Sequence, residues 1–429
     1  MNKRILLSII AAALMIFNGC IDKSTDKSTS ITHKENVSIT NKGSHFEVIL
    51  NFKDSFSHRA IGEEYGVKIL QAVPDYEFLF DSYLAEITQS DSVYNTFISR
   101  VNDIKPQVNK DYCDEIDGIA SKLSGLDQNI RGDGKLSTDE MYMLNLLPDV
   151  ARLAQCSALS VFGQRSQTQK NISARILDWH GGSQNQITKV QSVVTFKNKS
   201  KSICTIGYLG YMGCISGLND DKVFGAILDS STGKTYSSAS KYSYPLDLRY
   251  ALENYETIDE VANYIKSPDR QYTFSHLIFL CNPSTGKVLE NNISSGENCI
   301  REVRTEQSEL NGNIVWDISG SIGCVNSFLL KGNLDNHSSS ISNTSRFASI
   351  KSELLSKGDS VTLDELRTIA SFHKGKKPGE QTAGDLYNTR TQQIIIFEPN
   401  KLNLEVFFRP KDGNLPHVPT FEKIPIAFQ

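Results

Sequence analysis

Cys156, Arg175 and Asp178 are the residues whose types and order could carry out chemistry. Cys156 opens an apolar stretch at 156–163, and the other two lie in a second one at 171–178. A cysteine thiol has a pKa of about 8.5 and needs activation to act as a nucleophile at neutral pH. A cysteine at a chain N-terminus brings its own base, because an α-amino group titrates at about 7.7–8.0.

The spacing of these residues sets a geometric requirement. If 156–163 and 171–178 pair as antiparallel strands, the far end of the second strand returns beside Cys156. Arg175 and Asp178 are three residues apart, so strand alternation places them on opposite faces, and a bulge, a bend or an early strand end is needed for both to reach one site. The alternative interpretation is a buried core thiol, with Asp178 capping a turn and Arg175 as its ion-pair partner.

The sequence around these residues resembles the N-terminal-nucleophile cysteine hydrolases. That superfamily includes choloylglycine hydrolases, penicillin V acylase, the penicillin-forming acyltransferase, acid ceramidase and N-acylethanolamine acid amidase. The segments that carry the resemblance, in order, are Ala154-Gln-Cys156-Ser, Arg175-Ile-Leu-Asp178-Trp179, Gly207 to Asn219, Cys324-Val-Asn326-Ser-Phe328 and Ser345-Arg346-Phe347. Ile176 and Ser327 depart from the Asn and His that the superfamily often has at these places.

The resemblance implies a role for each candidate residue. Asp178 is expected to orient the α-amine, and Arg175 to support the thiolate. Asn219 and Asn326 are expected to donate hydrogen bonds to the oxyanion, a role that an amide NH₂ suits. Arg346 is expected to anchor the site or the substrate. The plainer alternatives are turn residues for the two asparagines and a solvated helix charge for the arginine.

An internal Cys156 has no α-amine, so the chain must be cut first. We expect an N→S acyl shift at Gln155–Cys156 followed by hydrolysis, after which the two chains stay associated. The mature protein is expected to hydrolyse the carbon–nitrogen bond of a linear N-acyl amide, or another lipid-like small molecule, through a thioester, or to transfer the acyl group. No metal or organic cofactor is expected. The alternatives are a non-catalytic lipoprotein that binds a partner and a phospholipase B-like esterase.

The elements that must position these residues follow from periodicity and capping signals. A strand is predicted at 46–52, and helices at 58–73, 76–103, 111–124, from 137, 246–254, 258–267, 342–356 and 362–372. Further strands are predicted at 156–163, 171–178, 189–197, 202–208, 211–217, 223–229, 274–281, 286–291, 300–306, 392–398 and 402–409. This order favours an α+β fold, and the resemblance implies an αββα sandwich with a helical pro-segment at 45–155 before a catalytic domain at 156–429.

The first residues indicate export. Lys3 and Arg4 precede an apolar run at 5–17 that is too short to span a bilayer and is typical of a signal peptide at 1–19. Cys20 follows a small residue, as in a bacterial lipobox, so we expect lipidation there and a disordered linker at 20–44. The expected location is the bacterial cell envelope, with membrane contact only through the N-terminal lipid.

Composition excludes several other classes. The net charge is −4 without a basic block, which argues against a nucleic-acid partner. The eight cysteines show no zinc-site spacing. Residues 129–140 fit the second half of a calcium-binding loop, but Arg131 stands where a ligand is required, so a turn followed by a helix cap is the favoured interpretation.

Overall fold

A computed structural model of the protein describes residues 35–54, 56–152, 154–231, 235–294, 298–380 and 383–428. The chain divides into two compact units, Met1–Glu35 and Asn36–Gln429, and the account below concerns the second. The predicted signal peptide, Cys20 and the first part of the linker lie outside the described residues.

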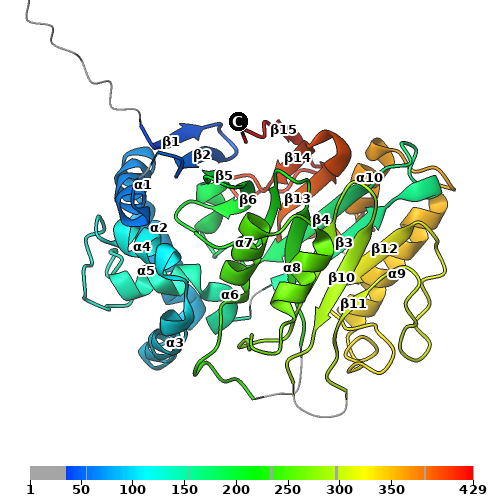
Figure 1. The fold of residues 1–429 in the computed structure, drawn as a ribbon, viewed down its shortest axis with the longest axis horizontal. Coiled ribbons are helices and arrows are strands. Elements are labelled where there is room, and N and C mark those ends of the chain that lie inside the picture. The colour runs from blue at the N-terminus through cyan, green and yellow to red at the C-terminus, as the bar shows by residue number, and fades with distance from the viewer. Residues whose placement is uncertain are drawn as a thin grey trace, which may run out of the picture. The chain divides into compact units, whose positions relative to one another are not determined.

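The residues before Cys156 are mainly helical, as predicted, and Figure 1 shows them grouped on one side of the unit. The helices are α1 (His58–Ala72), α2 (Tyr76–Thr88), α3 (Asp91–Ile104), α4 (Lys110–Ala120), α5 (Thr138–Asn145) and α6 (Leu147–Val150). The single helix predicted at 76–103 is two helices. Gln89 adopts a left-handed conformation that ends α2, and the Ser90 side chain accepts a hydrogen bond from Val93 N to start α3.

The loop before α5 is a turn and a helix cap, as the sequence favoured. Ser137 and Glu140 form a reciprocal capping box at the start of α5. The Asp81 carboxylate accepts hydrogen bonds from Gly132 N and Gly134 N, both glycines at positive φ. The loop is therefore held by protein donors, with a carboxylate of α2 at its centre.

Two sheets contain the described strands. The larger has nine strands in the order β1-β2-β5-β6-β7-β8-β9-β10-β11, antiparallel except for the β2–β5 pair. Its strands are β1 (Val37–Asn41), β2 (Phe46–Asn51), β5 (Gln191–Lys197), β6 (Ser202–Tyr208), β7 (Ser216–Asn219), β8 (Phe224–Asp229), β9 (His276–Cys281), β10 (Gly286–Asn291) and β11 (Arg301–Arg304).

The smaller sheet is wholly antiparallel, in the order β12-β3-β4-β13-β14-β15. Its strands are β3 (Ala154–Val161), β4 (Ile172–Trp179), β12 (Ser321–Val325), β13 (Thr391–Glu398), β14 (Asn403–Phe408) and β15 (Glu422–Ile424). β12 was not predicted, and it brings the segment before Asn326 alongside β3.

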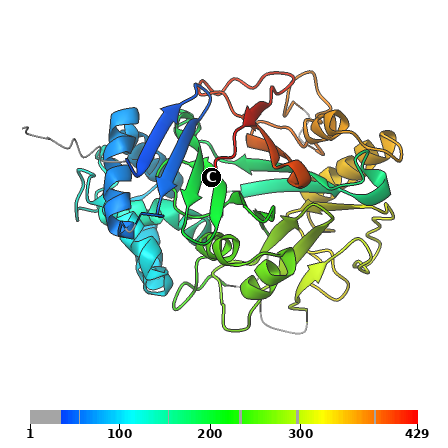
Figure 2. The same ribbon diagram turned by 45° about the horizontal axis from the view of Figure 1, so that its top comes forward.

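The smaller sheet forms a layer between two hydrophobic cores, since successive side chains of a strand point to opposite faces of the sheet. Cys156, Ala158 and Leu177 share one core with residues of the larger sheet. Leu159 and Ile176 lie in a second core with α9 (Ile341–Ser356) and α10 (Leu363–Ala370). Helices α7 (Tyr244–Asn254) and α8 (Ile258–Ile265) pack on the larger sheet. The predicted α+β class is confirmed, and Figure 2 shows α1–α5 and α9–α10 on opposite sides of the sheets.

Two expectations about elements were wrong. The linker expected at 20–44 contains β1, which pairs with β2 because Val37 is buried and Ile39 packs against the core on the same strand face. The strand predicted at 211–217 begins only at Ser216, since the glycine-rich segment before it forms a turn around Gly210, which has a positive φ.

Two further findings concern the described residues only. No helix among them is long and apolar enough to cross a membrane. The cysteines among them, Cys113, Cys156, Cys204, Cys214, Cys281, Cys299 and Cys324, are all free thiols.

Candidate active site

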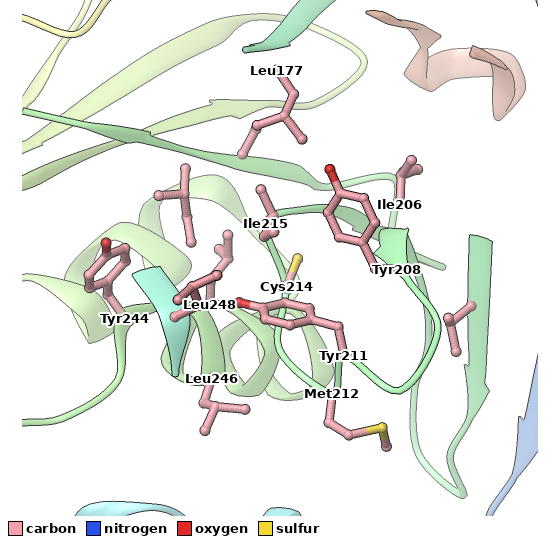
Figure 3. Packing of buried hydrophobic residues seen from close by; sticks show 14 of the residues in the cluster. Leu177, Ile206, Tyr208, Tyr211, Met212, Cys214, Ile215, Tyr244, Leu246 and Leu248 are labelled. Carbon is pink, nitrogen blue, oxygen red and sulfur yellow. The ribbon is translucent and has the colours of Figure 1, made fainter. Parts of the chain in front are cut away.

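The β3–β4 hairpin brings the candidate residues together. The strands pair antiparallel, with Cys156 opposite Leu177, Ala158 opposite Arg175 and Gln155 opposite Asp178. The Cys156 and Leu177 side chains enter the core between the two sheets. Figure 3 shows Leu177 pointing toward Ile215 across this core. The hairpin therefore places the peptide bond before Cys156 beside Asp178.

The Cys156 thiol is buried and contacts a guanidinium. Arg175 Nη2 lies 3.3 Å from Cys156 Sγ and also donates to the Ile227 carbonyl at 2.9 Å. Burial raises the pKa of the Cys156 thiol to about 11, although the Arg175 charge acts in the opposite direction. In the intact chain the thiol is therefore neutral at pH 7, beside a cation positioned to stabilise its thiolate.

Asn326 and Arg346 hold the backbone of Cys156. Asn326 Oδ1 accepts hydrogen bonds from Cys156 N at 2.7 Å and from Arg346 Nη2 at 3.0 Å. Arg346 Nη1 donates to the Cys156 carbonyl and to Ser157 Oγ. Arg346 reaches this place from α9, where Asn343 Oδ1 accepts from its Nη2 at 2.7 Å. Both polar groups of the Cys156 backbone are thus held by side chains from distant segments.

Asp178 approaches Cys156 from the other side of the sheet. Its two carboxylate oxygens accept from Thr391 Oγ1 at 2.7 Å and Asn388 Nδ2 at 2.8 Å. Burial raises its pKa, against the opposing effect of Arg346. The bulge, bend or early strand end expected between Arg175 and Asp178 is absent, because β4 pairs with β3 in unbroken register; the register shift lies in β13 after Thr391. Arg175 contacts the thiol from one face of β4, and Asp178 lies beside the Gln155–Cys156 backbone on the other face. The two side chains therefore approach Cys156 from opposite faces of the sheet.

The structure does not bring Asn219 to Cys156, so its expected role as an oxyanion donor is wrong. Its amide nitrogen donates to the carbonyls of Leu252 at 3.0 Å and Tyr255 at 2.9 Å, and its oxygen accepts from Val223 N at 3.0 Å. All of its polar atoms therefore serve to close the turn after β7 and to hold the end of α7.

A carboxylate that the sequence analysis missed lines the site. Asp229 ends β8 and borders a small cavity of about 10 Å³ together with Pro148, Cys156, Arg175, Leu177, Trp179, Ile215 and Ile227. Asn326 Nδ2 donates to the Asp229 carbonyl at 2.8 Å. The sequence signal that could have found Asp229 is an acidic residue at the end of an apolar strand. Strand alternation places its side chain on the same face as that of Ile227.

A second, apolar cavity of about 40 Å³ adjoins the first. It shares Pro148, Trp179 and Ile215 with it and extends under α2; its other lining residues are Tyr76, Phe80, Tyr83, Leu144, Leu147, Ile187, Tyr208, Leu209, Gly210 and Tyr211. Figure 3 shows Tyr208, Tyr211 and Ile215 side by side at this place. An apolar group attached to a carbonyl at Cys156 would be surrounded by apolar side chains in this cavity.

Metal ligation has no candidate site in the part of the chain that the structure describes, since no three His, Cys, Asp or Glu side chains there are grouped to hold an ion.

Comparison with known proteins gave structural matches only. No family model and no curated protein matches the chain. Similar solved structures include an N-acylethanolamine-hydrolyzing acid amidase ortholog of Caenorhabditis elegans, at 14% identity and TM-score 0.40 over 57% of this chain and 93% of that one.

Two others belong to the same group that the sequence resembles. Conjugated bile acid hydrolase of Clostridium perfringens matches at 13% identity and TM-score 0.36, over 64% of this chain and 97% of that one. Penicillin V acylase of Agrobacterium tumefaciens matches at 11% identity and TM-score 0.34, over 59% and 83%. At such TM-scores these likenesses carry no argument about function, which rests on the geometry around Cys156.

Proposed function

We propose that this protein is a self-cleaving cysteine amidase or acyltransferase that uses Cys156 as its N-terminal nucleophile. One observation carries the proposal: the Cys156 thiol contacts Arg175, while Asn326 and Arg346 hold its amide nitrogen and carbonyl. A core cysteine needs neither a guanidinium at its sulfur nor two polar side chains on its backbone.

The chemistry follows from these contacts. Cleavage of the Gln155–Cys156 bond would free an α-amine where Asn326 Oδ1 now accepts from the amide N–H, with Asp178 beside it. The amine would accept the thiol proton, and Arg175 would stabilise the thiolate. The thiolate would attack an acyl carbonyl, the amine product would leave, and water or a second nucleophile would resolve the thioester.

Asn326 is the best placed oxyanion donor among the sequence candidates. One of its amide hydrogens is donated to the Asp229 carbonyl, and an amide NH₂ has a second hydrogen to donate. Its orientation is fixed, because Arg346 and Cys156 N both donate to its oxygen. Such a preoriented donor is worth about 2.7–4 kcal/mol when the oxyanion forms.

The apolar cavity beside Cys156 supports a linear N-acyl amide with an apolar acyl group as the substrate class. An ester would pass through the same thioester, as in a phospholipase B-like enzyme. Assays of matched N-acyl amides and acyl esters separate these two activities, and we expect the amide to be cleaved with the higher kcat/KM.

To test the proposed function, the intact mass and the N-terminal sequence are measured for the purified wild-type protein and for the Cys156→Ala variant. We expect two wild-type chains, one of them starting at Cys156, and an uncut variant. If both proteins stay whole, the proposed function fails, and a non-catalytic binding protein with a structural Cys156 takes its place.

We also propose that the protein acts in the bacterial cell envelope, anchored through Cys20. The support is the basic start, the apolar run at 5–17 and the small residue before Cys20. Metabolic labelling with a fatty acid should mark the wild type and not Cys20→Ala. Equal labelling of the two proteins would overturn the anchor.

A further inference from the structure

The proposed self-cleavage needs a group that accepts the proton of the Cys156 thiol. Before the chain is cut, Cys156 has no α-amine, and its buried thiol carries a proton at neutral pH. Arg175 is already a cation and cannot accept that proton. Another group that faces the thiol must do so for the sulfur to attack the Gln155 carbonyl.

Asp229 is the carboxyl group in position to accept the proton. Among the described residues that line the cavity at Cys156, it is the one carboxylate. Ile227 and Asp229 lie on the same face of β8, and the Ile227 carbonyl accepts from Arg175. The Asp229 backbone is fixed by the hydrogen bond from Asn326. Cys156, Arg175 and Asp229 therefore line the same small cavity.

Two other buried carboxyl groups nearby are placed differently. Asp178 emerges on the opposite face of β4, where Thr391 and Asn388 donate to its oxygens. Asp149 accepts from Ser243 Oγ at 2.6 Å and from Tyr244 N, and burial holds its pKa well above the ordinary range. Asp149 thus holds the N-terminus of α7 and does not line the cavity.

The Tyr244 hydroxyl can form a hydrogen bond with Asp229 whether the Asp229 carboxyl group is ionised or protonated. Its hydroxyl oxygen lies 2.6 Å from the Pro148 carbonyl and 3.2 Å from Asp229 Oδ1, and a phenol has one hydrogen to donate. When Asp229 is ionised, the hydroxyl can donate to it. When Asp229 is protonated, the hydroxyl can donate to Pro148 and accept from the acid.

We propose that Asp229 is the proton acceptor and donor of self-cleavage, an inference that rests on the proposed function. The Asp229 carboxylate takes the Cys156 thiol proton as the sulfur attacks the Gln155 carbonyl carbon. The bond from that carbon to Cys156 N then breaks, and Asp229 returns the proton to the departing nitrogen. This leaves a thioester between Gln155 and Cys156 Sγ. Water hydrolyses it to the Gln155 carboxylate, the free thiol and the free amine.

The charged and titratable groups around Asp229 are compatible with this cycle. Arg175 from β4 stabilises the thiolate while the proton is on Asp229. Tyr244 from α7 and Cys156 from β3 are the partners already described. Arg152 donates to the carbonyl of Ser230, the residue after Asp229, and His276 of β9 lies opposite Asp229 in the strand register, where burial lowers the pKa of the imidazole.

The experiment follows self-cleavage by intact mass in full-length wild type, Asp229→Asn and Asp149→Asn. A positioned acid–base group is worth about 100- to 10,000-fold in rate, so we expect Asp229→Asn to cleave at least about 100-fold more slowly. Asp149→Asn should cleave like the wild type, because Asp149 does not line the cavity at the thiol. Thermal unfolding of each variant checks its fold.

A second variant separates proton transfer from a structural role. Asp229→Ala leaves space for a small carboxylate, and added formate should restore part of its self-cleavage. Wild-type cleavage in Asp229→Asn would overturn the proposal, as would a folded Asp229→Ala that formate does not restore. If the wild type itself stays whole, the proposed function fails first, which is a distinguishable result.

Discussion

At the scale of single residues, two arginines act on one cysteine in different ways. Arg175 contacts the sulfur from the core between the sheets, and Arg346 contacts the Cys156 carbonyl from α9. A guanidinium suits both places because it is planar, always charged and able to donate in several directions at once. The first arginine lowers the pKa of the thiol against the effect of burial, and the second holds the Cys156 carbonyl in place.

Replacing Arg175 should make the thiol less acidic. A neighbouring cation lowers a pKa by about 1–3 units, so Arg175→Gln should slow alkylation of Cys156 by iodoacetamide at pH 7 at least about tenfold. The measurement is the alkylation rate as a function of pH. Arg165→Gln is the control, since Arg165 binds carbonyls of Ser319 and Gly358. An unchanged pH profile in Arg175→Gln would show that the guanidinium does not act on the sulfur.

At the scale of elements, helix α2 forms one wall of the apolar cavity. Tyr76 Oη donates to the Leu209 carbonyl at 3.1 Å, and Tyr83 Oη donates to the His180 carbonyl at 3.0 Å. Trp179 Nε1 donates to Tyr83 Oη at 2.8 Å. The segment before the proposed cleavage site therefore supplies part of the cavity lining next to Cys156, so we expect it to shape the proposed acyl site.

Filling the cavity should discriminate between acyl chains. Ile215 borders both cavities, and Ile215→Phe adds volume where the acyl group is expected. Overpacking costs about 1–3 kcal/mol, so kcat/KM should fall about tenfold or more for long-chain amides and much less for acetyl amides. Steady-state kinetics over a chain-length series measures this. A uniform loss at all lengths would contradict an acyl site here.

At the scale of the whole unit, a buried ion pair joins the residues before and after the proposed cleavage site. Arg249 of α7 donates to both oxygens of Glu115 of α4, at 2.5 and 2.9 Å, and both side chains are fully buried. The Arg249 guanidinium lies over the rings of Tyr112 and Phe196, and His58 contacts Glu115 at 2.7 Å. This contact should keep the two chains together after cleavage.

Removing the Glu115 carboxylate from this ion pair should lower the free energy of unfolding. Glu115→Gln removes the fully buried counter-ion of Arg249 and leaves Glu253, which accepts from Arg249 Nε at 3.0 Å, as its remaining carboxylate partner. Breaking a buried pair costs about 3–5 kcal/mol of unfolding free energy, and we expect a loss at the lower end of this range. Urea unfolding measures the loss, and size-exclusion chromatography of the cleaved protein tests whether the chains separate. Glu63→Gln is a matched control, because its partners Arg59 and Lys122 are partly exposed. Equal stability of the two variants would rule out the ion pair as the main link.

The same pair predicts how stability depends on pH. Burial opposes ionisation, but the charge of Arg249 lowers the pKa of Glu115 below its ordinary value. A lowered folded-state pKa contributes stability that is present above the unfolded pKa and is lost as pH falls through the folded one. The difference in unfolding free energy between wild type and Glu115→Gln should therefore shrink on acidification below about pH 4, the ordinary carboxyl range.

Local signals in the sequence determined most of the elements and part of the site. Short apolar stretches predicted β3 and β4, and capping boxes at Ser137, Thr257 and Thr362 marked the starts of α5, α8 and α10. These features depend on neighbours close in the chain, so they can be read without the fold. The order of Cys156, Arg175 and Asp178 likewise predicted a paired hairpin.

Only the tertiary structure decided which polar residues meet at Cys156. Asn219 and Asp229 stand at the ends of the adjacent strands β7 and β8, and both are types that could serve the site. The Asn219 amide donates to carbonyls at the end of α7, whereas Asp229 lines the cavity at the thiol. The reason is physical: side-chain direction and contacts between distant segments come from sheet packing, which no local spacing records.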